Sequence, residues 1–267
     1  MFADWQQLVQ PAEINALGQA VGSPVPDWSG ARHPPHKILA GQYCRVEPLD
    51  VARHGGQLFD ALHQMPGGAN WTYLSHGPFP TLESWEDWMG EHIAQGDPQF
   101  YAIVDQTDGV AIGLASYLRI APADGSIEVG FLHFSPRLQR SRLATEAMYL
   151  MMREAFALGY RRYEWKCDAQ NSPSVKAALR LGFTFEGLFR QARTNKGRNR
   201  DTAWFSILDH EWPARRAALE SWLDEQNFDG EGRQRCSLAQ IVAMRGRNRA
   251  ADFMPAVGGA TMDACNR

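Results

Sequence analysis

One segment of this chain constrains the fold more than any other, because it joins two strands through a helix. Residues 127–134 form an apolar, alternating run that predicts a strand, and 143–158 have the periodicity of an amphipathic helix. Residues 161–168 alternate again and predict a second strand. A strand–helix–strand unit joins two parallel strands through a right-handed crossover. We therefore expect at least one parallel pair of strands.

The connection that leads into this helix is polar and rich in arginine. The stretch 135–147 carries Arg137, Arg140 and Arg142, and the first N–H groups of a helix have no partner inside the helix. The helix dipole and these donors favour an anion, so we interpret the turn as a phosphate-binding site. A plain solvated connection is the alternative. Because ligands bind at the carboxyl ends of parallel strands, the segment after Asp168 should lie beside this turn.

The remaining pattern predicts a sheet in which most neighbours are antiparallel. Short alternating runs joined by turn-forming residues predict strands, and amphipathic runs that follow a capping residue predict helices. The chain is therefore expected to be an α/β (α+β) protein with a mixed, mostly antiparallel central sheet of about seven strands flanked by helices. The further strands are expected at 42–49, 99–105, 110–120, 183–192 and 201–208, and the further helices at 50–65, 81–94, 173–181 and 212–228.

The chain divides by pattern into an arm, a domain and a tail. Prolines interrupt 1–41, which predicts a partly irregular N-terminal arm with one short helix at 11–20. The patterned region 42–228 has a length that suits a single core. Glycines and arginines with scattered apolar residues follow, which predicts a weakly ordered tail at 229–267 with a short helix at 237–244.

Composition argues against several classes of protein. The formal net charge is −3 over 267 residues, whereas nucleic-acid-binding domains are usually strongly basic. No apolar run approaches the ~18 residues of a membrane span, and the N-terminus lacks the pattern of a secretory signal. The four cysteines and eight histidines show no metal-ligand spacing. We therefore expect a cytoplasmic protein with no metal and with neither nucleic acid nor membrane as partner.

Two connections carry residues that are unusual for loops. Residues 66–80 contain glycines and prolines but also Trp71, Tyr73 and Phe79, which either cover the core edge or line a pocket. The basic connection 193–200 is either a solvated hairpin tip or a contact to an acidic ligand. The sequence leaves both alternatives open.

Three motifs follow one another within the region from about 42 to 212. They are I-E-V-G-F (127–131), S-P-R-L-Q-R-S-R-L-A-T-E-A (135–147) and C-D-A-Q-N-S-P-S-V-K-A-A-L-R-L-G-F-T-F-E-G (167–187), and the last continues into F-R-Q-A-R-T-N-K-G-R-N-R-D-T-A-W-F-S at 189–206. Their order and spacing resemble the GCN5-related N-acetyltransferase (GNAT) superfamily, and within it the Rim-type branch of ribosomal-protein N-terminal acetyltransferases.

The resemblance implies a fold and an activity. It implies the GNAT fold, with a splayed parallel pair of strands at the CoA site, and acetyl-CoA as co-substrate. The activity would be N-acyl transfer, from acetyl-CoA to a primary amine on a protein N-terminus or a small molecule, by direct attack in a ternary complex. The alternatives are a non-catalytic CoA-binding module of the same fold and an enzyme that uses a longer acyl-CoA such as succinyl-CoA. The protein would be a monomer or a homodimer.

The resemblance also assigns residues that would hold the donor. The family's pyrophosphate turn, Q/R-x-x-G-x-G/A, aligns with 139–144, and Arg142 stands where the family usually has glycine. Backbone N–H groups near the end of the preceding strand would hold the pantetheine and the thioester, and an asparagine after the second strand would bond the CoA arm. The expected donor contacts are Leu132, His133, Gln139, Arg140, Ser141, Arg142, Leu143, Ala144 and Asn171.

Two residues are the candidates for proton transfer. Glu128 lies in an otherwise apolar strand beside the proposed acyl site, where burial would favour a carboxylate that accepts a proton near neutral pH. A solvent-facing strand residue is the alternative. Ser174 resembles the serine that protonates the departing thiolate. Helix capping is the alternative for Ser174 and Asn171, although Ser172 is expected to fill that role.

The acceptor is expected to meet aromatic side chains. Trp71 and Tyr73 are the candidates for a wall of the acceptor pocket, and Trp204 is the candidate for a pocket residue on a central strand. These three complete the residues that the sequence proposes for the site.

Overall fold

The structure is a computed structural model that describes the backbone of residues 13–251 and the side chains of residues 13–245. The ends of the predicted arm and tail, 1–12 and 252–267, lie outside the described residues. The chain divides into two compact units, 1–30 and 31–267, and each is described by itself.

The described part of the first unit is a short two-stranded ribbon. Glu13–Ile14 (β1) pairs antiparallel with Ala20–Val21 (β2). The side chain of Asn15 accepts backbone N–H groups of the turn between them, and Gly18 adopts φ 74°. Asparagine and glycine at these positions favour a turn. The helix expected at 11–20 is therefore wrong where the structure describes it.

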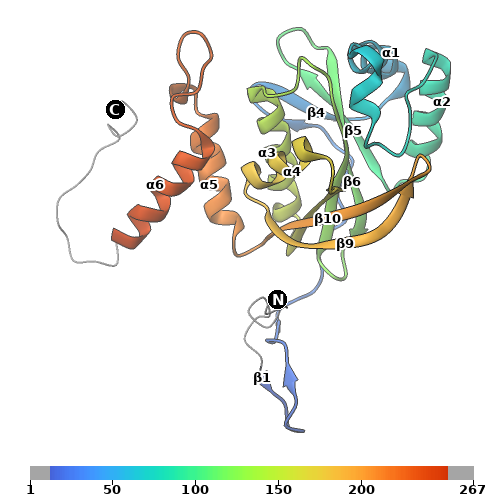
Figure 1. The fold of residues 1–267 in the computed structure, drawn as a ribbon. Helices are drawn as coiled ribbons and strands as arrows, with labels where there is room; N and C mark the ends of the chain where they lie inside the picture. The colour runs from blue at the N-terminus through green and yellow to red at the C-terminus, as the bar shows by residue number, and fades with distance from the viewer. Residues whose placement is uncertain (1–12, 252–267) are drawn as a thin grey trace. The chain divides into compact units, whose positions relative to one another are not determined.

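A mixed sheet of eight strands forms the centre of the second unit (Figure 1). The strand order is β3-β4-β5-β6-β7-β8-β10-β9, and β7 with β8 is the one parallel pair among the described strands. The predicted fold class is confirmed, and the strand beyond the expected seven is the short β3. The strands are β3 (Leu39–Ala40), β4 (Cys44–Pro48), β5 (Gln99–Asp105), β6 (Ala111–Ala121), β7 (Ser126–Phe134), β8 (Arg162–Asp168), β9 (Thr184–Asn195) and β10 (Arg198–Leu208).

Helices cover both faces of the sheet, and each face has its own core. On β5, Phe100, Ala102 and Val104 join the core under α1 and α2, whereas Tyr101 and Ile103 join the core under α3. The helix expected at 237–244 is longer in the structure, where it is labelled α6. Side chains from this helix join the core under α3. The helices are α1 (Val51–Leu62), α2 (Leu82–Ile93), α3 (Arg142–Ala157), α4 (Ser172–Leu181), α5 (Trp212–Leu223) and α6 (Leu238–Ala251), with 3₁₀ turns η2 (Pro66–Trp71) and η3 (Glu225–Asn227).

No helix in the described part of the chain is long and apolar enough to cross a bilayer.

A buried carboxylate fixes α3 against the β3–β4 hairpin. Glu146, which is 5% exposed, accepts the backbone N–H groups of Gln42, Tyr43 and Cys44 at 2.6, 2.7 and 2.8 Å. A Cβ atom at Gly41 would lie 2.4 Å from the carboxylate carbon, so this position requires glycine. Three donors satisfy a charge that would be costly to bury alone.

The parallel strands β7 and β8 pair along only part of their length. Their register runs from Ser126 opposite Arg162 to Val129 opposite Trp165, although both strands continue beyond that point. The second half of β7 pairs with β6, and that of β8 pairs with β10. The two strands therefore diverge toward their carboxyl ends.

A bulge in β7 accompanies this divergence. Gly130 lies opposite Ser116 and His133 lies opposite Leu114, so β7 uses one more residue than β6 over the same stretch. Phe131, within the bulge, has a positive φ of 50°. A bulge bends its strand and leaves one residue out of the ladder, which turns β7 away from β8.

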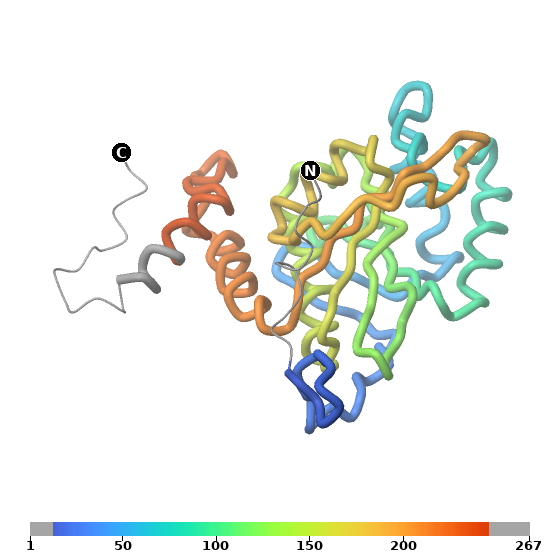
Figure 2. Tube along the Cα trace, turned by 60° about the horizontal axis from the view of Figure 1, so that its bottom comes forward, coloured from blue at the N-terminus to red at the C-terminus, as the bar shows by residue number. Residues whose placement is uncertain are grey.

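The β9–β10 hairpin reaches the connection between α1 and α2. Figure 2 shows the hairpin (orange) running toward these helices, and the Nζ atom of Lys196 at its tip donates to the carbonyl of Trp71 at 2.8 Å. On the other side, the Tyr73 hydroxyl donates to the carbonyl of Gln170 at 3.0 Å. Residues 66–80 are thereby held against both the hairpin and the start of α4.

Two histidines are buried among the aromatic rings under α1 and α2. His76 stacks on Trp88 at 4.1 Å, and His133 meets the edge of Trp71 at 4.2 Å. The pKa of each histidine is lowered to about 3, chiefly by burial, and at His76 the neighbouring His92 contributes to this shift. Both rings are therefore neutral at pH 7.

We expect the free energy of unfolding to fall as the pH is lowered from 7 to 4. The histidines have pKa values near 6.5 in the unfolded chain and about 3 in the fold, so between these values the unfolded state binds more protons. Each histidine should cost about 1.4 kcal/mol per pH unit below about 6. Urea unfolding at several pH values measures this slope.

The variant His76→Phe keeps a stacked ring but cannot bind a proton. Its free energy of unfolding should therefore depend less steeply on pH, by the contribution of one histidine. The matched control is His210→Gln, because His210 is 63% exposed and should leave the slope unchanged. Equal slopes for His76→Phe and the unsubstituted protein would contradict the assignment.

Candidate active site

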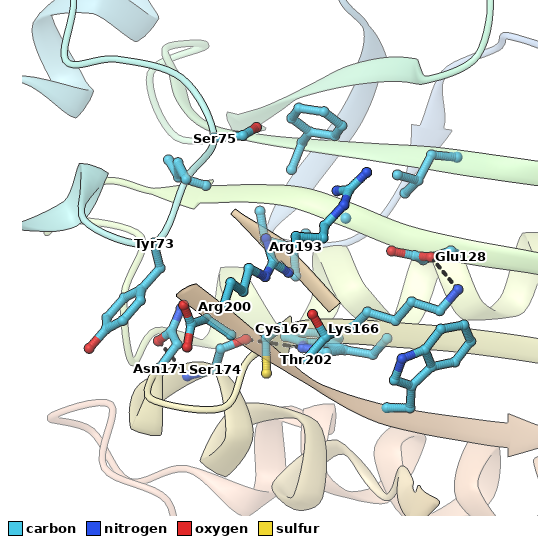
Figure 3. A pocket seen from close by; sticks show the side chains of 18 of the residues that line it. Tyr73, Ser75, Glu128, Lys166, Cys167, Asn171, Ser174, Arg193, Arg200 and Thr202 are labelled. Atoms are coloured by element: carbon cyan, nitrogen blue, oxygen red, sulfur yellow. Dashed lines mark hydrogen bonds and ion pairs between the residues drawn. The ribbon is translucent and has the colours of Figure 1, made fainter. Parts of the chain in front are cut away.

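A pocket of about 280 Å³ lies where β7 and β8 diverge (Figure 3). Its walls come from β6, β7, the end of β8, the start of α4, the β9–β10 hairpin and the connection 73–76. Segments that are distant in sequence meet here because the sheet opens between its parallel strands. Of the residues proposed from the sequence, the pocket is lined by Tyr73, Glu128, Leu132, Asn171, Ser174 and Trp204.

Glu128 is buried in this pocket and paired with two cations. It is 4% exposed, and Lys166 Nζ lies 2.8 Å from its Oε2 atom. Arg119 donates to the same oxygen. Lys166 also lies 2.6 Å from Glu164 Oε2 and 3.7 Å from the centre of the Trp204 ring. Both cations are on Oε2, so Oε1 is the oxygen left for a ligand.

The start of α4 differs from the expectation in its capping residue. Asn171 is the N-cap, since its Oδ1 atom accepts the N–H of Ser174 at 3.2 Å. Ser172 is instead the first residue of the helix, so the expectation that Ser172 fills the cap is wrong. The side-chain carbonyl of Asn171 reaches the orphan N–H that a cap must satisfy. Asn171 keeps its side-chain NH₂ group for a ligand.

The hydroxyl of Ser174 already accepts one hydrogen bond. Trp165 Nε1 donates to Ser174 Oγ at 3.0 Å. A hydroxyl has one proton to donate besides its acceptor sites. The contact with Trp165 therefore fixes the oxygen, and the proton of Ser174 can be donated either to the neighbouring Cys167 sulfur or to a ligand in the pocket.

The predicted phosphate turn lies at the start of α3 and does not line this pocket. Ser141 is the N-cap of α3, and its Oγ atom accepts the N–H of Ala144 at 3.0 Å. Arg140 has a positive φ of 57°, and the side chain of Gln139 donates to the carbonyl of Phe134 at 2.9 Å. Helix geometry leaves the N–H groups of the first α3 residues without an intrahelical acceptor. These donors suit an anion.

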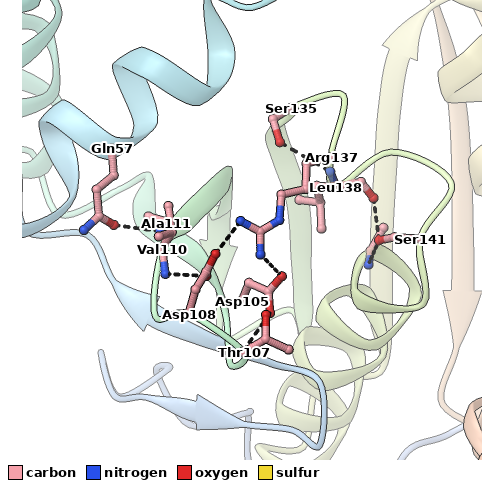
Figure 4. Close-up of polar contacts among 11 residues, drawn as sticks. Gln57, Asp105, Thr107, Asp108, Val110, Ala111, Ser135, Arg137, Leu138 and Ser141 are labelled. Carbon is pink, nitrogen blue, oxygen red and sulfur yellow. Dashed lines mark hydrogen bonds and ion pairs between the residues drawn. The ribbon is translucent and has the colours of Figure 1, made fainter.

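Two of the three arginines of the turn have partners within the protein. Arg137 pairs with Asp105 and Asp108 (Figure 4). The Arg142 guanidinium donates to the Tyr43 hydroxyl at 3.0 Å and lies 3.7 Å from the centre of the Phe228 ring. The Arg142 side chain is therefore engaged within the protein, although the sequence placed Arg142 among the contacts of the donor. Only its backbone N–H remains at the turn.

Two further expected residues have their side chains in the core. Trp71 is 1% exposed and belongs to the core under α1 and α2, so the expectation that it walls the pocket is corrected. The imidazole of His133 is also buried, with its Nε2 atom 2.6 Å from Asn70 Nδ2. The proposed role of His133 therefore concerns its backbone alone. The neighbouring Leu132 lines the pocket, and Leu143 is half-buried in the first turn of α3.

The sequence reasoning missed Arg119 and Lys166, two of the cations of the pocket. Lys166 lies two residues after Glu164, which is paired with Glu128 in the parallel register, so strand alternation puts all three side chains on one face. That register was the signal that could have found Lys166. Arg193 and Arg200 line the pocket from the hairpin, whose geometry the sequence left open. Within residues 13–245, no group of three or more His, Cys, Asp or Glu side chains is arranged to hold a metal.

Comparisons with known proteins agree with this architecture. The family model for the acetyltransferase (GNAT) domain matches residues 55–184. The crystal structure of a GCN5-related N-acetyltransferase from Brucella melitensis is 43% identical and superposes with a TM-score of 0.80, over 82% of this chain and 100% of that one. An uncharacterized N-acetyltransferase p20 from Bacillus licheniformis is 33% identical over 115 residues, which are 43% of this chain and 64% of that protein.

The chain belongs to the GCN5-related N-acetyltransferase (GNAT) family. It is thereby classed among the acetyl-CoA-dependent N-acetyltransferases. RimL, a ribosomal L7/L12 α-N-protein acetyltransferase whose structure holds coenzyme A, is 19% identical with a TM-score of 0.53 over 64% of this chain and 98% of that one. That likeness shows the fold alone, so membership of the Rim-type branch stays a prediction.

We expect Arg142→Ala to destabilise the fold because its guanidinium packs between two aromatic rings. The loss should be about 1–2 kcal/mol in the free energy of unfolding, measured by urea titration. Arg140→Ala is the matched control, since Arg140 is exposed and its loss should cost less than about 0.5 kcal/mol. Equal stability of the two variants would refute the packing role.

Proposed function

We propose that this protein transfers the acetyl group of acetyl-CoA to a primary amine by direct attack in a ternary complex. The observation that carries the proposal is the pocket between the diverging strands, where Glu128 from β7 and Ser174 from α4 line one cavity. An acyl transfer needs a proton acceptor for the amine and a proton donor for the departing thiolate. The site offers one candidate for each.

Glu128 is proposed to bind the incoming amine through Oε1 and to take its proton. Its Oε2 atom is held by Lys166 at 2.8 Å, so the carboxylate is fixed in place before the amine arrives. As the N–C bond forms and the C–S bond breaks, Ser174 gives its proton to the leaving sulfur. Holding both substrates in one cavity supplies a further part of the rate.

The donor is proposed to lie along the end of β7 and the start of α3. The backbone N–H groups at Leu132, within the bulge, and at His133, where the ladder resumes, would bond the thioester and the pantetheine. The turn 139–144 would take the pyrophosphate through the N–H groups of the first α3 residues and the side chain of Arg140. Asn171 would bond the CoA arm. When bound, acetyl-CoA supplies the activated acyl group.

The acceptor is proposed to be a protein N-terminus or a small molecule, in contact with Tyr73 and Trp204. We propose a cytoplasmic enzyme, a monomer or a homodimer, that uses no metal and binds neither nucleic acid nor membrane. Four cationic side chains line the pocket, namely Arg119, Lys166, Arg193 and Arg200. This observation keeps a longer, acidic acyl-CoA such as succinyl-CoA as a second candidate donor.

Replacing Glu128 by Gln should lower kcat at neutral pH by about a hundredfold, since general bases contribute about that much. The dissociation constant for CoA, measured by calorimetry, should change little. Glu164→Gln is the matched control, because Glu164 shares Lys166 with Glu128 but does not line the pocket. An equal loss in both variants would remove Glu128 as the base.

The variant Arg140→Ala should raise the KM for acetyl-CoA several-fold and leave kcat nearly unchanged. A surface arginine near a phosphate contributes a charge-assisted bond that acts on binding alone. Steady-state kinetics with a fixed, saturating amine measures both constants. The exposed Arg233→Ala serves as the control, because Arg233 pairs with Asp229 and Glu231. An unchanged KM in Arg140→Ala would refute the assignment of the turn.

A further inference from the structure

Two arginines face each other across the hairpin strands at the pocket. Arg193 on β9 and Arg200 on β10 are directly paired in the antiparallel register, and both line the pocket. Like charges in this arrangement repel. Burial lowers the pKa of the Arg200 guanidinium, which means that its charge is partly desolvated. Their arrangement is costly unless an anion lies between or beside them.

The carboxylates near this pair are engaged elsewhere. Glu128 is held by two other cations. Asp201, next to Arg200 in sequence, accepts the N–H of Gln191 at 2.7 Å. Asp168 accepts the N–H of Gln170 through Oδ1, and it attracts Arg200 without forming an ion pair. Among the described residues, no carboxylate pairs with either arginine.

Polar atoms beside the two arginines are also without partners. Thr202 is 6% exposed and its Oγ1 atom has no hydrogen-bond partner in the described structure, as is true of Arg200 Nε and Trp204 Nε1. Positions 200, 202 and 204 alternate along β10, so these three side chains are on one face. Each carries a proton that can be donated to the same ligand. Buried donors of this kind usually have a partner.

This face of the sheet lies away from the helices that would hold the CoA phosphates. Thr202 is opposite Asp168 and Trp204 is opposite Lys166 in the register. The intervening Cys167 belongs to the core that contains α3 and α4. The donors of β10 therefore face the side opposite to α3, where the proposed phosphate turn lies. An anion bound here belongs to the acceptor and not to the phosphates of the donor.

We propose that Arg193, Arg200 and Thr202 form a subsite for a carboxylate carried by the amine acceptor. The inference rests on the proposed acetyl transfer to an amine, and it narrows the acceptor class. Glu128 would take the amine while the arginines take the carboxylate, in the paired geometry that guanidinium and carboxylate groups favour. The acceptor is then an amino carboxylate, either a free amino acid or a peptide with an acidic residue near its N-terminus.

The test compares acceptors that differ only in this charge. Acetyl transfer is measured for phenylalanine against phenylalaninamide, and for a four-residue peptide amide with aspartate at its second position against the same peptide with asparagine. The value of kcat/KM should be at least tenfold higher for the charged member of one pair, and which pair shows it distinguishes the two sources. The amine of phenylalaninamide is the less basic one, so intrinsic reactivity works against the expected preference for phenylalanine.

The variants Arg200→Met and Arg193→Met should bring this ratio close to one and leave the KM for acetyl-CoA unchanged. Arg198→Met is the matched control, because Arg198 is exposed on the same hairpin and does not line the pocket. It should keep the full ratio. Thermal unfolding checks that each variant folds, and Arg200→Lys, which keeps the charge but not the paired geometry, should retain an intermediate ratio.

Several outcomes would overturn the subsite. They are active transfer with no preference for the charged acceptor, a ratio that survives in both methionine variants, and a main effect on the KM for acetyl-CoA. A preference for succinyl-CoA over acetyl-CoA that is lost in Arg200→Met would assign the arginines to the acyl group instead. Failure to acetylate any amine would contradict the proposed function itself. In that case, calorimetric titration still tests the subsite. Phenylalanine or the aspartate peptide should have a lower dissociation constant than its neutral counterpart, and equal dissociation constants in both pairs would show that the inference is wrong.

Discussion

Backbone pairing between β7 and β8 stops partway along both strands, and the site depends on this interruption. Beyond Val129 and Trp165, each strand finds its hydrogen-bond partners on its other side, in β6 and β10. The backbone groups of β7 and β8 that point into the gap have no partner in the other strand, so they are open to a ligand. The bulge at Phe131 bends β7 away, so the opening is part of the folded sheet and does not need a ligand to form it. Side chains from six separate segments can then meet in one cavity.

Charge pairing decides which polar residues around this opening are available to ligands. Arg137 lies just before the predicted phosphate turn and Arg142 lies within it, but the first pairs with aspartates and the second packs on aromatic rings. Lys166 is shared between two glutamates. Arg193 and Arg200 have no such partner among the described residues. Residue type alone would make these five cations equal candidates for binding a ligand. Their contacts show which of them are already paired within the protein and which are available to a ligand.

Much of the fold could be predicted from the sequence, because strand alternation, helix periodicity and turn residues are local signals. They indicated the parallel pair, the antiparallel strands and the helices, and the motif around Glu128 pointed to a residue that lines the pocket. The direction of a single side chain is not a local signal. Arg142 turns toward Phe228, which is remote in sequence, and Trp71 is buried by rings from several elements. The choice of Asn171 over Ser172 as the cap depended on a helix boundary shifted by one residue, which sequence patterns rarely fix.

The packing of Arg142 on Phe228 links the start of α3 to the segment that follows α5. Phe228 is held in turn by an isolated bridge to Gln234 and by the edge of Trp222, so the segment after α5 supports the first turn of α3. Where a glycine would leave that turn independent of its surroundings, arginine makes it depend on a ring contributed by the C-terminal segment. A shortened or rearranged C-terminal segment would thus alter the first turn of α3 without changing any residue in that turn.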